Sequence, residues 1–321
     1  MRFNYTLLTI ALAAASLSAT AADAPKVPQK AAYKVGFAQT ESNNPWRLAE
    51  TKSFMDVAAQ CGWQVITTDA GGSAAKQVAD IDSLIAQKVD LLVFPPREDK
   101  PLIPAVMKAK KAGIPVILVD RDVDHKLAKP GVDYITFIGS DFIDQGRRAA
   151  QALAKAMGDK GNIIELEGST GASAATDRKK GFDDEIKKHP GMKIVASQSG
   201  DFNRDKGRQL AQTLLQAHPE ANAVYGHNDE MAVGAITAIE AAGKVAGKDI
   251  FVVSIDGQRN ALEAIIAGKM VATVQSSPYF GPISCKIAQA SAKGEKIPTW
   301  VKVEDKIYDI SNAAKDLAEG F

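Results

Sequence analysis

The sequence predicts an α/β fold of two parallel sheets, each covered by helices. Short β-branched runs alternate with amphipathic segments along nearly the whole chain, which is the order that parallel sheets require. One sheet of about ten parallel strands would be large, and the 321 residues exceed the length at which a single core stops growing. We therefore expect two domains with about five or six strands in each sheet.

The predicted strands are short apolar runs, and the predicted helices have apolar residues at three- and four-residue spacing. In chain order, the strands are Lys34–Ala38, Gln64–Thr67, Leu91–Phe94, Val116–Val119, Ile135–Ile138, Ile163–Leu166, Ile194–Ala196, Ala223–Tyr225, Ile250–Ile255 and Val271–Val274. The helices between them include Trp46–Gln60, Ala74–Gln87, Phe142–Met157, Asp205–Ala217 and Met231–Ala242.

The first 21 residues contain the parts of a secretory signal peptide. Arg2 precedes an apolar run from Tyr5 to Ala15, and Ala19-Thr20-Ala21 matches the small-residue cleavage site. The apolar run is shorter than the roughly 20 residues of a membrane-spanning helix, so an anchor is the weaker interpretation. We expect cleavage after Ala21, export to the periplasm and a flexible leader over residues 22–31.

Composition argues against several kinds of partner. Lys and Arg number 39 against 38 Asp and Glu, a balance unlike that of nucleic-acid-binding proteins. Two cysteines and four histidines without a zinc motif predict no metal site. The segment Gly243–Lys248 is one residue short of a phosphate-binding loop and precedes its strand, so we expect a turn there and no cofactor. His227 has no nucleophile placed near it by the sequence, which disfavours a catalytic role.

Charged and amide side chains follow five of the predicted strands. Ligands of parallel sheets bind outside the carboxyl ends of the strands, so these loops are candidate binding loops. They are Gln39–Arg47, Asp120–Asp122, Gly226–Asp229, Asp256–Gly257 and Gln275–Ser277. Paired donors and acceptors beside a Trp suit a neutral sugar, because its hydroxyls both donate and accept and its C–H face packs on aromatic rings.

These residues also have purely structural interpretations, which the sequence leaves open. Asp120 and Arg121 can form a local ion pair at the start of their loop. Asn44 and Asn228 can cap the helices that follow them, a role that is compatible with binding. Trp46 can belong to the core instead of forming a platform for a ligand.

Five stretches together carry a family pattern. They are Asn43–Trp46, Val119–Arg121, Ser173–Phe182, Gly200–Phe202 and His227–Met231. In these stretches the chain resembles the periplasmic sugar-binding proteins of the ribose and galactose type. The segments Trp46–Thr51, Asp177–Phe182 and Ser197–Phe202 are most similar to the galactofuranose-binding members.

The resemblance implies two αβα domains joined by three crossovers, near Gly139–Asp141, Gln275–Ser277 and Val303–Asp305. The amino-terminal domain would comprise residues 32–139 and 277–303, and the carboxy-terminal domain residues 140–276 and 304–321. A monosaccharide, galactofuranose or another aldose, would bind between the domains by hinge closure and pass to the membrane permease of an ABC transporter. The resemblance implies a monomer that is not an enzyme.

The same resemblance assigns the expected ligand contacts. They are Thr40, Asn44, Trp46, Arg47, Asp120, Arg121, Arg178, Phe202, Asn228, Asp256 and Gln275. Arg47 departs from the ribose-binding pattern, which has a second aromatic residue there, and this favours a ligand with an extra polar arm such as a hexofuranose. Next to Arg178, we expect Lys179 and Lys180 on a solvated helix face.

Other function classes share some of these features. An exported sugar-processing enzyme would need two carboxylates acting as acid and base, for which Asp120 and Asp256 are the candidates. A sugar-sensing subunit for a receptor has the same sequence requirements as a transport protein. A transcription regulator with a related sensing domain would need a basic DNA-binding segment where the signal peptide is predicted.

Cys61 and Cys285 allow two interpretations. Export favours a disulfide, which would restrict the unfolded chain. However, Cys61 is expected at the far end of the helix from Trp46, about 15 residues and roughly 20 Å from the cleft edge. Cys285 is expected near that edge, and a disulfide needs Cα atoms within about 7 Å. We therefore predict two free, buried thiols.

Overall fold

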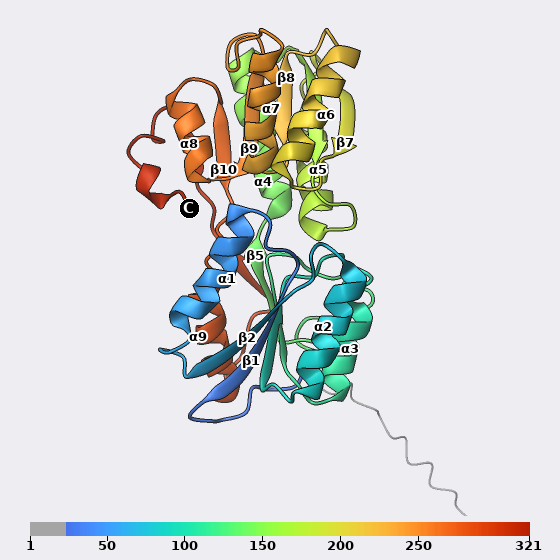
Figure 1. Cartoon of the computed structure of the whole chain (residues 1–321), viewed down its shortest axis with the longest axis vertical. Coiled ribbons are helices and arrows are strands. Elements are labelled where there is room, and N and C mark those ends of the chain that lie inside the picture. Colours follow the sequence, from blue (N-terminus) through green and yellow to red (C-terminus); the bar gives the residue numbers. More distant parts are fainter. Residues whose placement is uncertain (1–23) are drawn as a thin grey trace, which may run out of the picture.

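The computed structural model describes residues 24–321 and consists of two lobes, each built on a six-stranded sheet (Figure 1). The predicted signal peptide lies outside the described residues. Both sheets are mainly parallel, and helices cover both faces of each sheet. The predicted α/β class is confirmed.

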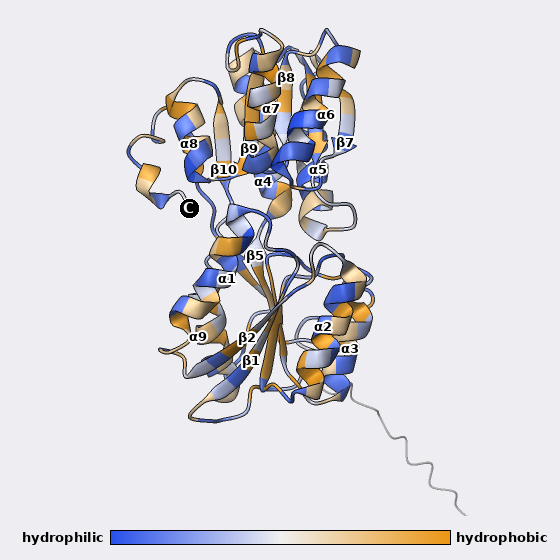
Figure 2. Cartoon of the chain, in the orientation of Figure 1, coloured by the Kyte–Doolittle hydropathy of each residue, from blue (hydrophilic) through white to orange (hydrophobic). Residues whose placement is uncertain are grey.

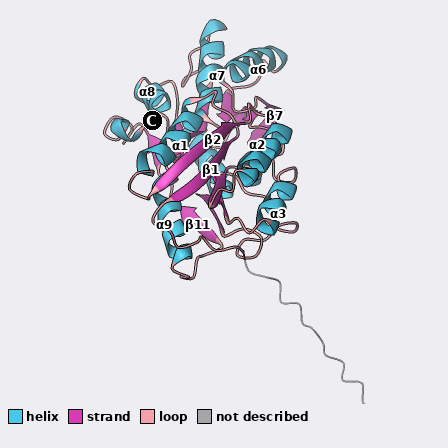
Figure 3. Ribbon diagram, turned by 60° about the horizontal axis from the view of Figure 1, so that its bottom comes forward, coloured by secondary structure: helices cyan, strands magenta, loops and turns pink. Residues whose placement is uncertain are grey.

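The sheet of the first lobe is parallel throughout, in the order β11-β5-β4-β3-β1-β2. Helices α1 (Pro45–Val57) and α9 (Gly281–Ala292) cover one face, and α2 (Ala74–Ala86) and α3 (Ile103–Lys111) cover the other (Figure 3). The strands are β1 (Tyr33–Gln39), β2 (Trp63–Asp69), β3 (Leu91–Phe94), β4 (Val116–Val119), β5 (Thr136–Ser140) and β11 (Trp300–Val303).

The sheet of the second lobe has the order β12-β10-β9-β8-β6-β7, and only β12 runs antiparallel to its neighbour among the described strands. Its strands are β6 (Gly161–Glu167), β7 (Met192–Ser199), β8 (Ala223–Gly226), β9 (Phe251–Asp256), β10 (Ala272–Gln275) and β12 (Ile307–Asp309). The helices are α4 (Phe142–Met157) and α5 (Ser173–Ile186) on one face, and α6 (Arg204–Ala217), α7 (Asp229–Ala241) and α8 (Arg259–Ile266) on the other. A short 3₁₀ helix, Leu317–Glu319, follows near the end of the chain.

All ten predicted strands are present. Those at the centre of the first sheet are buried at every position, because helices cover both faces, and this explains their unbroken apolar sequence. Figure 2 shows the same pattern, with apolar residues gathered on the strands of both lobes. Among residues 24–321, no helix has the length and hydropathy needed to cross a membrane.

The chain passes between the lobes three times. The first crossing lies between β5 and α4, the second between β10 and α9, and the third between β11 and β12. As a result, α9 lies beside α1 in the first lobe although the two helices are far apart in the sequence (Figure 1).

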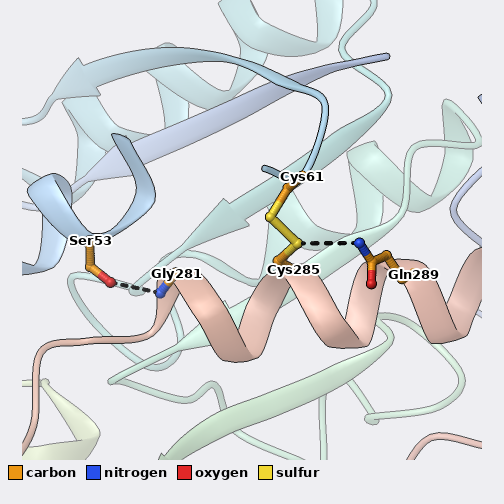
Figure 4. The surroundings of a disulfide bond; sticks show 5 residues. All are labelled: Ser53, Cys61, Gly281, Cys285 and Gln289. Carbon is orange, nitrogen blue, oxygen red and sulfur yellow. Dashed lines mark hydrogen bonds between the residues drawn. A yellow bond between two sulfur atoms is a disulfide. The ribbon is translucent and has the colours of Figure 1, made fainter. Parts of the chain in front are cut away.

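Cys61 and Cys285 form a disulfide with Cα atoms 6.0 Å apart, so the prediction of two free thiols is wrong (Figure 4). The error concerns how far from the cleft edge α9 begins. After the second crossing the chain runs along α1, and α9 starts only where the backbone N–H of Gly281 donates to Ser53 Oγ at 3.0 Å. A Cβ atom on Gly281 would lie 2.1 Å from the carbonyl oxygen of Ser53, so this approach requires glycine. Cys285, one turn further, therefore lies level with Cys61 and not at the cleft edge.

The predicted flexible leader is partly held by the first lobe. Val27 is buried in the core formed by α1, α9 and the sheet. Its backbone N–H donates to Ser291 Oγ of α9 at 3.1 Å. An apolar side chain between Pro25 and Pro28 thus packs against the lobe, which corrects the expectation for this part of the leader.

Candidate functional site

A cavity lies between the two lobes at the carboxyl ends of their strands. Both lobes contribute to its wall, so the cavity depends on how the lobes face each other. Nine of the residues that the sequence assigned to ligand contact line it. The full wall is Glu41, Asn44, Trp46, Arg47, Asp120 and Arg121 from the first lobe, and Ala174, Arg178, Phe202, Asn228 and Asp256 from the second.

Thr40 and Gln275 do not line this cavity. The hydroxyl of Thr40 donates to Gln39 Oε1 at 3.2 Å, and its backbone N–H donates to the same atom at 2.8 Å. The side-chain amide of Gln275 donates to the hydroxyl of Tyr308 at 2.9 Å, and its oxygen accepts from the backbone N–H of Lys306 at 3.2 Å. Both side chains therefore bond to the protein next to the cavity wall.

Three wall residues have positive φ angles. They are Asp120 at 57°, Phe202 at 55° and Asp256 at 141°. Non-glycine residues adopt such angles at a cost of about 1–3 kcal/mol each, and they concentrate at functional sites. The ring of Phe202 also fills the space beside Gly168, where a Cβ atom would lie 2.0 Å from the ring. The backbone is thus shaped to direct these side chains toward the cavity.

Asn44 and Asn228 both cap helices and line the cavity. Asn44 Oδ1 accepts from the backbone N–H of Arg47 at 2.9 Å, and Asn228 Oδ1 accepts from that of Met231 at 3.0 Å. The amide of Asn228 also donates to the carbonyl of Phe202 at 3.2 Å. The capping interpretation is confirmed, and the caps place both helix N-termini at the cavity.

Each lobe contributes one aromatic ring to the wall. The guanidinium carbon of Arg47 lies 4.6 Å from the ring centroid of Trp46, whose Nε1 donates to the carbonyl oxygen of Ser276 at 2.8 Å. The ring of Phe202 belongs to the second lobe, and its centroid lies 5.4 Å from the guanidinium carbon of Arg121 of the first lobe. These rings are anchored by cations as well as by packing.

Arg47 forms the shortest ion pairs of the first lobe's wall. Its Nη2 lies 2.7 Å from Asp120 Oδ2, and its Nη1 lies 2.7 Å from Glu50 Oε2. Arg121 stands further from Asp120, with 3.7 Å between Nε and Oδ2, so the expected local pair is weaker than the pair with Arg47. Burial raises the pKa of Glu50 to about 7, although the charge of Arg47 acts in the opposite direction.

Glu41 is a wall residue that the sequence reasoning missed. Its carboxylate lies 3.6 Å from the guanidiniums of Arg97 and Arg121 and 3.8 Å from that of Arg47. It belongs to the loop after β1 that was already a candidate binding loop, so its position in that loop was the available signal. Ala174, at the start of α5, has only a methyl side chain, so no polar group marked it as a wall residue.

Arg178 organises the wall of the second lobe. Its Nη1 donates to the carbonyl oxygen of His227 at 2.7 Å, and its Nε donates to Gln145 Oε1 at 2.9 Å. Its Nη2 lies 3.7 Å from Asp256 Oδ1. Burial raises the pKa of Asp256 well above its ordinary range, while the charge of Arg178 opposes this shift.

Lys179, expected on a solvated face, is instead half-buried. Its ammonium donates to the buried carboxylate of Glu165 and, at 3.0 Å, to Ser197 Oγ. The other oxygen of Glu165 lies 2.9 Å from Nε2 of His227, which is fully buried and outside the cavity wall. A buried carboxylate requires such partners, and this explains the position of Lys179. Lys180 is exposed, as expected, and pairs with Asp184.

Residues 35–296 match the family model described as periplasmic binding protein domain. The chain belongs to the periplasmic binding protein family. The family resemblance expected from the sequence is confirmed.

Relatives of this periplasmic binding protein carry sugar names. The galactofuranose-binding protein YtfQ of Escherichia coli (strain K12) is 37% identical over 317 residues, which is 98% of this chain and 96% of the relative. The ribose import binding protein RbsB of Bacillus subtilis (strain 168) is 34% identical over 279 residues, 87% of this chain and 88% of the relative. A solved structure from Mycobacterium smegmatis in complex with β-D-fucofuranose is 40% identical, covers 89% of this chain and 94% of its own, and superposes with a TM-score of 0.85.

The cavity wall of this periplasmic binding protein has equal numbers of basic and acidic side chains. It contains three guanidinium groups and three carboxylates, together with two side-chain amides. The cationic residues are Arg47, Arg121 and Arg178, and the acidic residues are Glu41, Asp120 and Asp256. Such a wall offers paired donors and acceptors to a ligand without net charge. Within residues 24–321, no group of three or more His, Cys, Asp and Glu side chains is arranged to hold a metal ion.

Proposed function

We propose that this chain binds one monosaccharide in the cavity between its lobes, as the sugar-binding component of an ABC importer. The observation that carries the proposal is the wall, in which equal numbers of guanidinium and carboxylate groups stand beside an aromatic ring from each lobe. A sugar hydroxyl donates to a carboxylate while it accepts from a guanidinium, and the rings cover the C–H faces of the sugar. The sugar names of the relatives support the same ligand class.

Galactofuranose is the first candidate ligand, and another aldose is the second. The name of the E. coli relative and the fucofuranose bound to the M. smegmatis protein support a furanose ring. Arg47 adds a polar group where the ribose-binding pattern has an aromatic residue, and Asp120 and Glu50 hold it in place. Such a group suits the additional hydroxyls of a hexofuranose side arm.

The proposal includes the compartment in which the chain binds the sugar and the partner that receives it. The signal peptide directs the chain to the periplasm, where a monomer of the mature protein takes up the sugar and closes by rotation of the lobes about the three crossings. The closed form then delivers the sugar to a membrane permease. The chain holds the sugar without changing it chemically, which separates this proposal from a sugar-processing enzyme.

Native mass spectrometry of the mature protein, purified without refolding, tests the proposal. We expect a bound species whose extra mass matches one pentose or hexose, and release of the same sugar on denaturation. Calorimetry with the released sugar would then give one site per chain. A protein that carries no sugar and binds none of a panel of aldoses would contradict the proposal, and release of a hydrolysed product would favour the enzyme.

A transport assay in cells lacking the permease separates import from sensing, because only import needs that partner.

A further inference from the structure

We propose that Gln145 is a positioning residue that couples the sugar cavity to the hinge between the lobes. Gln145 does not line the cavity, and its side chain is buried in the first turn of α4. One end of its amide contacts Arg178 on the cavity wall, and the other end contacts two of the chain crossings. The inference rests on the proposed function, because it takes Arg178 as a sugar contact.

The hydrogen bonds of Gln145 fix the orientation of its amide. Its Oε1 accepts from Arg178 Nε at 2.9 Å. Its Nε2 donates to the carbonyl oxygen of Gln275 at 3.1 Å and to Asp305 Oδ2 at 2.8 Å. The opposite orientation would place the amide oxygen against two acceptors and the amide hydrogens against a guanidinium. The side chain therefore has one arrangement that satisfies all its partners.

These partners bring all three crossings into one hydrogen-bonded cluster. Gln275 is the last residue of β10, at the second crossing, and Asp305 lies in the third crossing between β11 and β12. Ser140, the last residue of β5 at the first crossing, donates from Oγ to Asp305 Oδ1 at 3.0 Å. The carbonyl oxygen of Asp305 also accepts from Arg148 of α4 at 2.8 Å. Gln145 thus connects this cluster to Arg178 on the cavity wall.

The packing of α4 against α5 places Gln145 beside Arg178. At Gly146, a Cβ atom would lie 2.1 Å from the carbonyl oxygen of Arg178, and at Gly181 it would lie 2.0 Å from that of Ile143. The two helices therefore approach backbone to backbone. Both belong to the second lobe, so the contact between Gln145 and Arg178 is internal to that lobe. The contacts with Gln275 and Asp305 instead involve segments next to the backbone that must rotate when the lobes separate.

In this arrangement a bound sugar affects the position of the crossings through Arg178 and Gln145. A sugar that fixes the guanidinium of Arg178 also fixes the acceptor atom of Gln145, and thereby its two donor hydrogens at the crossings. The coupling is reciprocal, so crossings held in the closed arrangement position Arg178 for the sugar before it binds. Removing the donors of Gln145 should therefore weaken sugar binding although no wall residue has changed.

Two substitutions distinguish the hydrogen bond that Gln145 accepts from the hydrogen bonds that it donates. Gln145→Glu keeps an oxygen acceptor for Arg178 but places a carboxylate against Asp305 and the carbonyl of Gln275. Gln145→Met keeps the approximate volume and removes every hydrogen bond. Gln151→Met is the matched control, because Gln151 lies on the same helix and donates to Glu185 of α5 at 3.1 Å. No hydrogen bond of Gln151 reaches a crossing in the part of the chain that the structure describes.

The first measurement is the distance between the lobes in sugar-free protein. Nitroxide labels on Met107→Cys of α3 and Gln212→Cys of α6 report it by double electron–electron resonance. The only native cysteines, Cys61 and Cys285, are joined and do not take the label. We expect both Gln145 variants to shift the distance distribution toward longer or broader distances, and Gln151→Met to match the wild type. Unchanged distributions in both Gln145 variants would overturn the coupling, whether or not the protein binds a sugar.

The second measurement is calorimetry with D-ribose, L-arabinose, D-galactose and D-fucose as probes. For the probe that the wild type binds best, we expect both Gln145 variants to bind about tenfold or more weakly, and the control to stay within about twofold. Wild-type affinity in Gln145→Glu would show that Gln145 only holds Arg178 and would overturn the proposal. If the wild type binds none of the probes, the proposed function is what fails, and the distance measurement still decides whether Gln145 holds the crossings.

Discussion

The indole Nε1 of Trp46 donates a hydrogen bond of 2.8 Å to the carbonyl oxygen of Ser276, which lies 230 residues further along the chain. Trp46 is the aromatic wall residue of the first lobe, and Ser276 belongs to the second crossing. The ring is thus fixed to a segment beside the hinge. The wall of the first lobe and the hinge are therefore in direct contact.

Trp46→Phe should weaken sugar binding although an aromatic ring remains. The variant loses one buried hydrogen bond, with a net contribution of about 0.5–1.5 kcal/mol, so we expect an affinity about 2- to 12-fold lower by calorimetry. Trp63→Phe is the control, because Trp63 is buried in the core of the first lobe and outside the cavity wall. Equal affinities for Trp46→Phe and the wild type would show that the bond to Ser276 does not position the ring for binding.

Asp120→Ala and Asp256→Ala should each weaken sugar binding strongly. Each carboxylate is buried on the wall, one in each lobe, and a charged hydrogen bond contributes about 1.5–3 kcal/mol, which corresponds to about a 10- to 150-fold loss of affinity. Asp124→Ala is the control for changes in the loop, since Asp124 follows Asp120 closely but does not line the cavity. If both wall variants titrate like the wild type while they remain folded, the sugar binds elsewhere.

Glu50 should make the stability of the protein depend on pH. Burial raises its pKa from 4.5 to about 7, so folding favours the neutral carboxyl. The stabilisation linked to this group is complete below about pH 4.5 and is lost as the pH rises through about 7. A glutamine side chain does not titrate, so Glu50→Gln lacks this loss of stability at higher pH. The free energy of unfolding of Glu50→Gln, relative to the wild type, should therefore increase by roughly 1–3 kcal/mol between pH 5 and pH 8.

Urea unfolding at several pH values measures this difference. The wild-type curve alone is not diagnostic, because burial also raises the pKa of Asp229 to about 7. Glu240→Gln is a suitable control, since Glu240 is exposed and pairs with Lys269 on the surface. Parallel pH profiles for Glu50→Gln and the wild type would mean that Glu50 titrates in its ordinary range.

The disulfide should stabilise the fold without changing the sugar site. Thiol counting in denaturant without reductant should find no free thiol. Replacing Cys61 and Cys285 together by Ala should lower the free energy of unfolding by about 3–5 kcal/mol, because the bond joins residues 224 positions apart. Neither cysteine lines the cavity, so sugar affinity should stay the same. Two reactive thiols in untreated protein would contradict the disulfide itself.

Fold class and most elements were predictable because burial imposes simple patterns on the sequence. Leu91–Phe94 and Val116–Val119 are covered on both faces, and their unbroken apolar runs gave the observed strand limits. The missed strands β11 and β12 have four and three residues and lie at sheet edges. Trp300–Val303 alternates between exposed and half-buried positions and includes a lysine, so it lacks the apolar run that marks a strand.

The wall of the candidate site was largely predictable, but its supporting residues were not. Loops that follow strands can be read from the sequence, and the resemblance selected residues within them. Glu50 and Gln145 lie in helices, outside the candidate loops, and they act through Arg47 and Arg178. The contact between Gln145 and Arg178 joins two helices, and no pattern in the sequence indicates it. The disulfide was missed for a related reason, since the start of α9 is set by the approach of Gly281 to Ser53.

The first lobe is assembled from both ends of the chain, and this sets an order on its folding. When synthesis has reached the end of β10, each lobe has five of its six strands, but the first lobe also lacks α9 and Cys285. The amino-terminal part of the chain therefore waits for one strand, for the helix that packs beside α1 and for its cross-link, while the second lobe lacks only the edge strand β12 and the short 3₁₀ helix. A chain emerging from its amino terminus would thus have helices for both faces of the second sheet before α9 is available to the first. One face of the first sheet would remain partly uncovered, and the disulfide unformed, until synthesis is nearly finished.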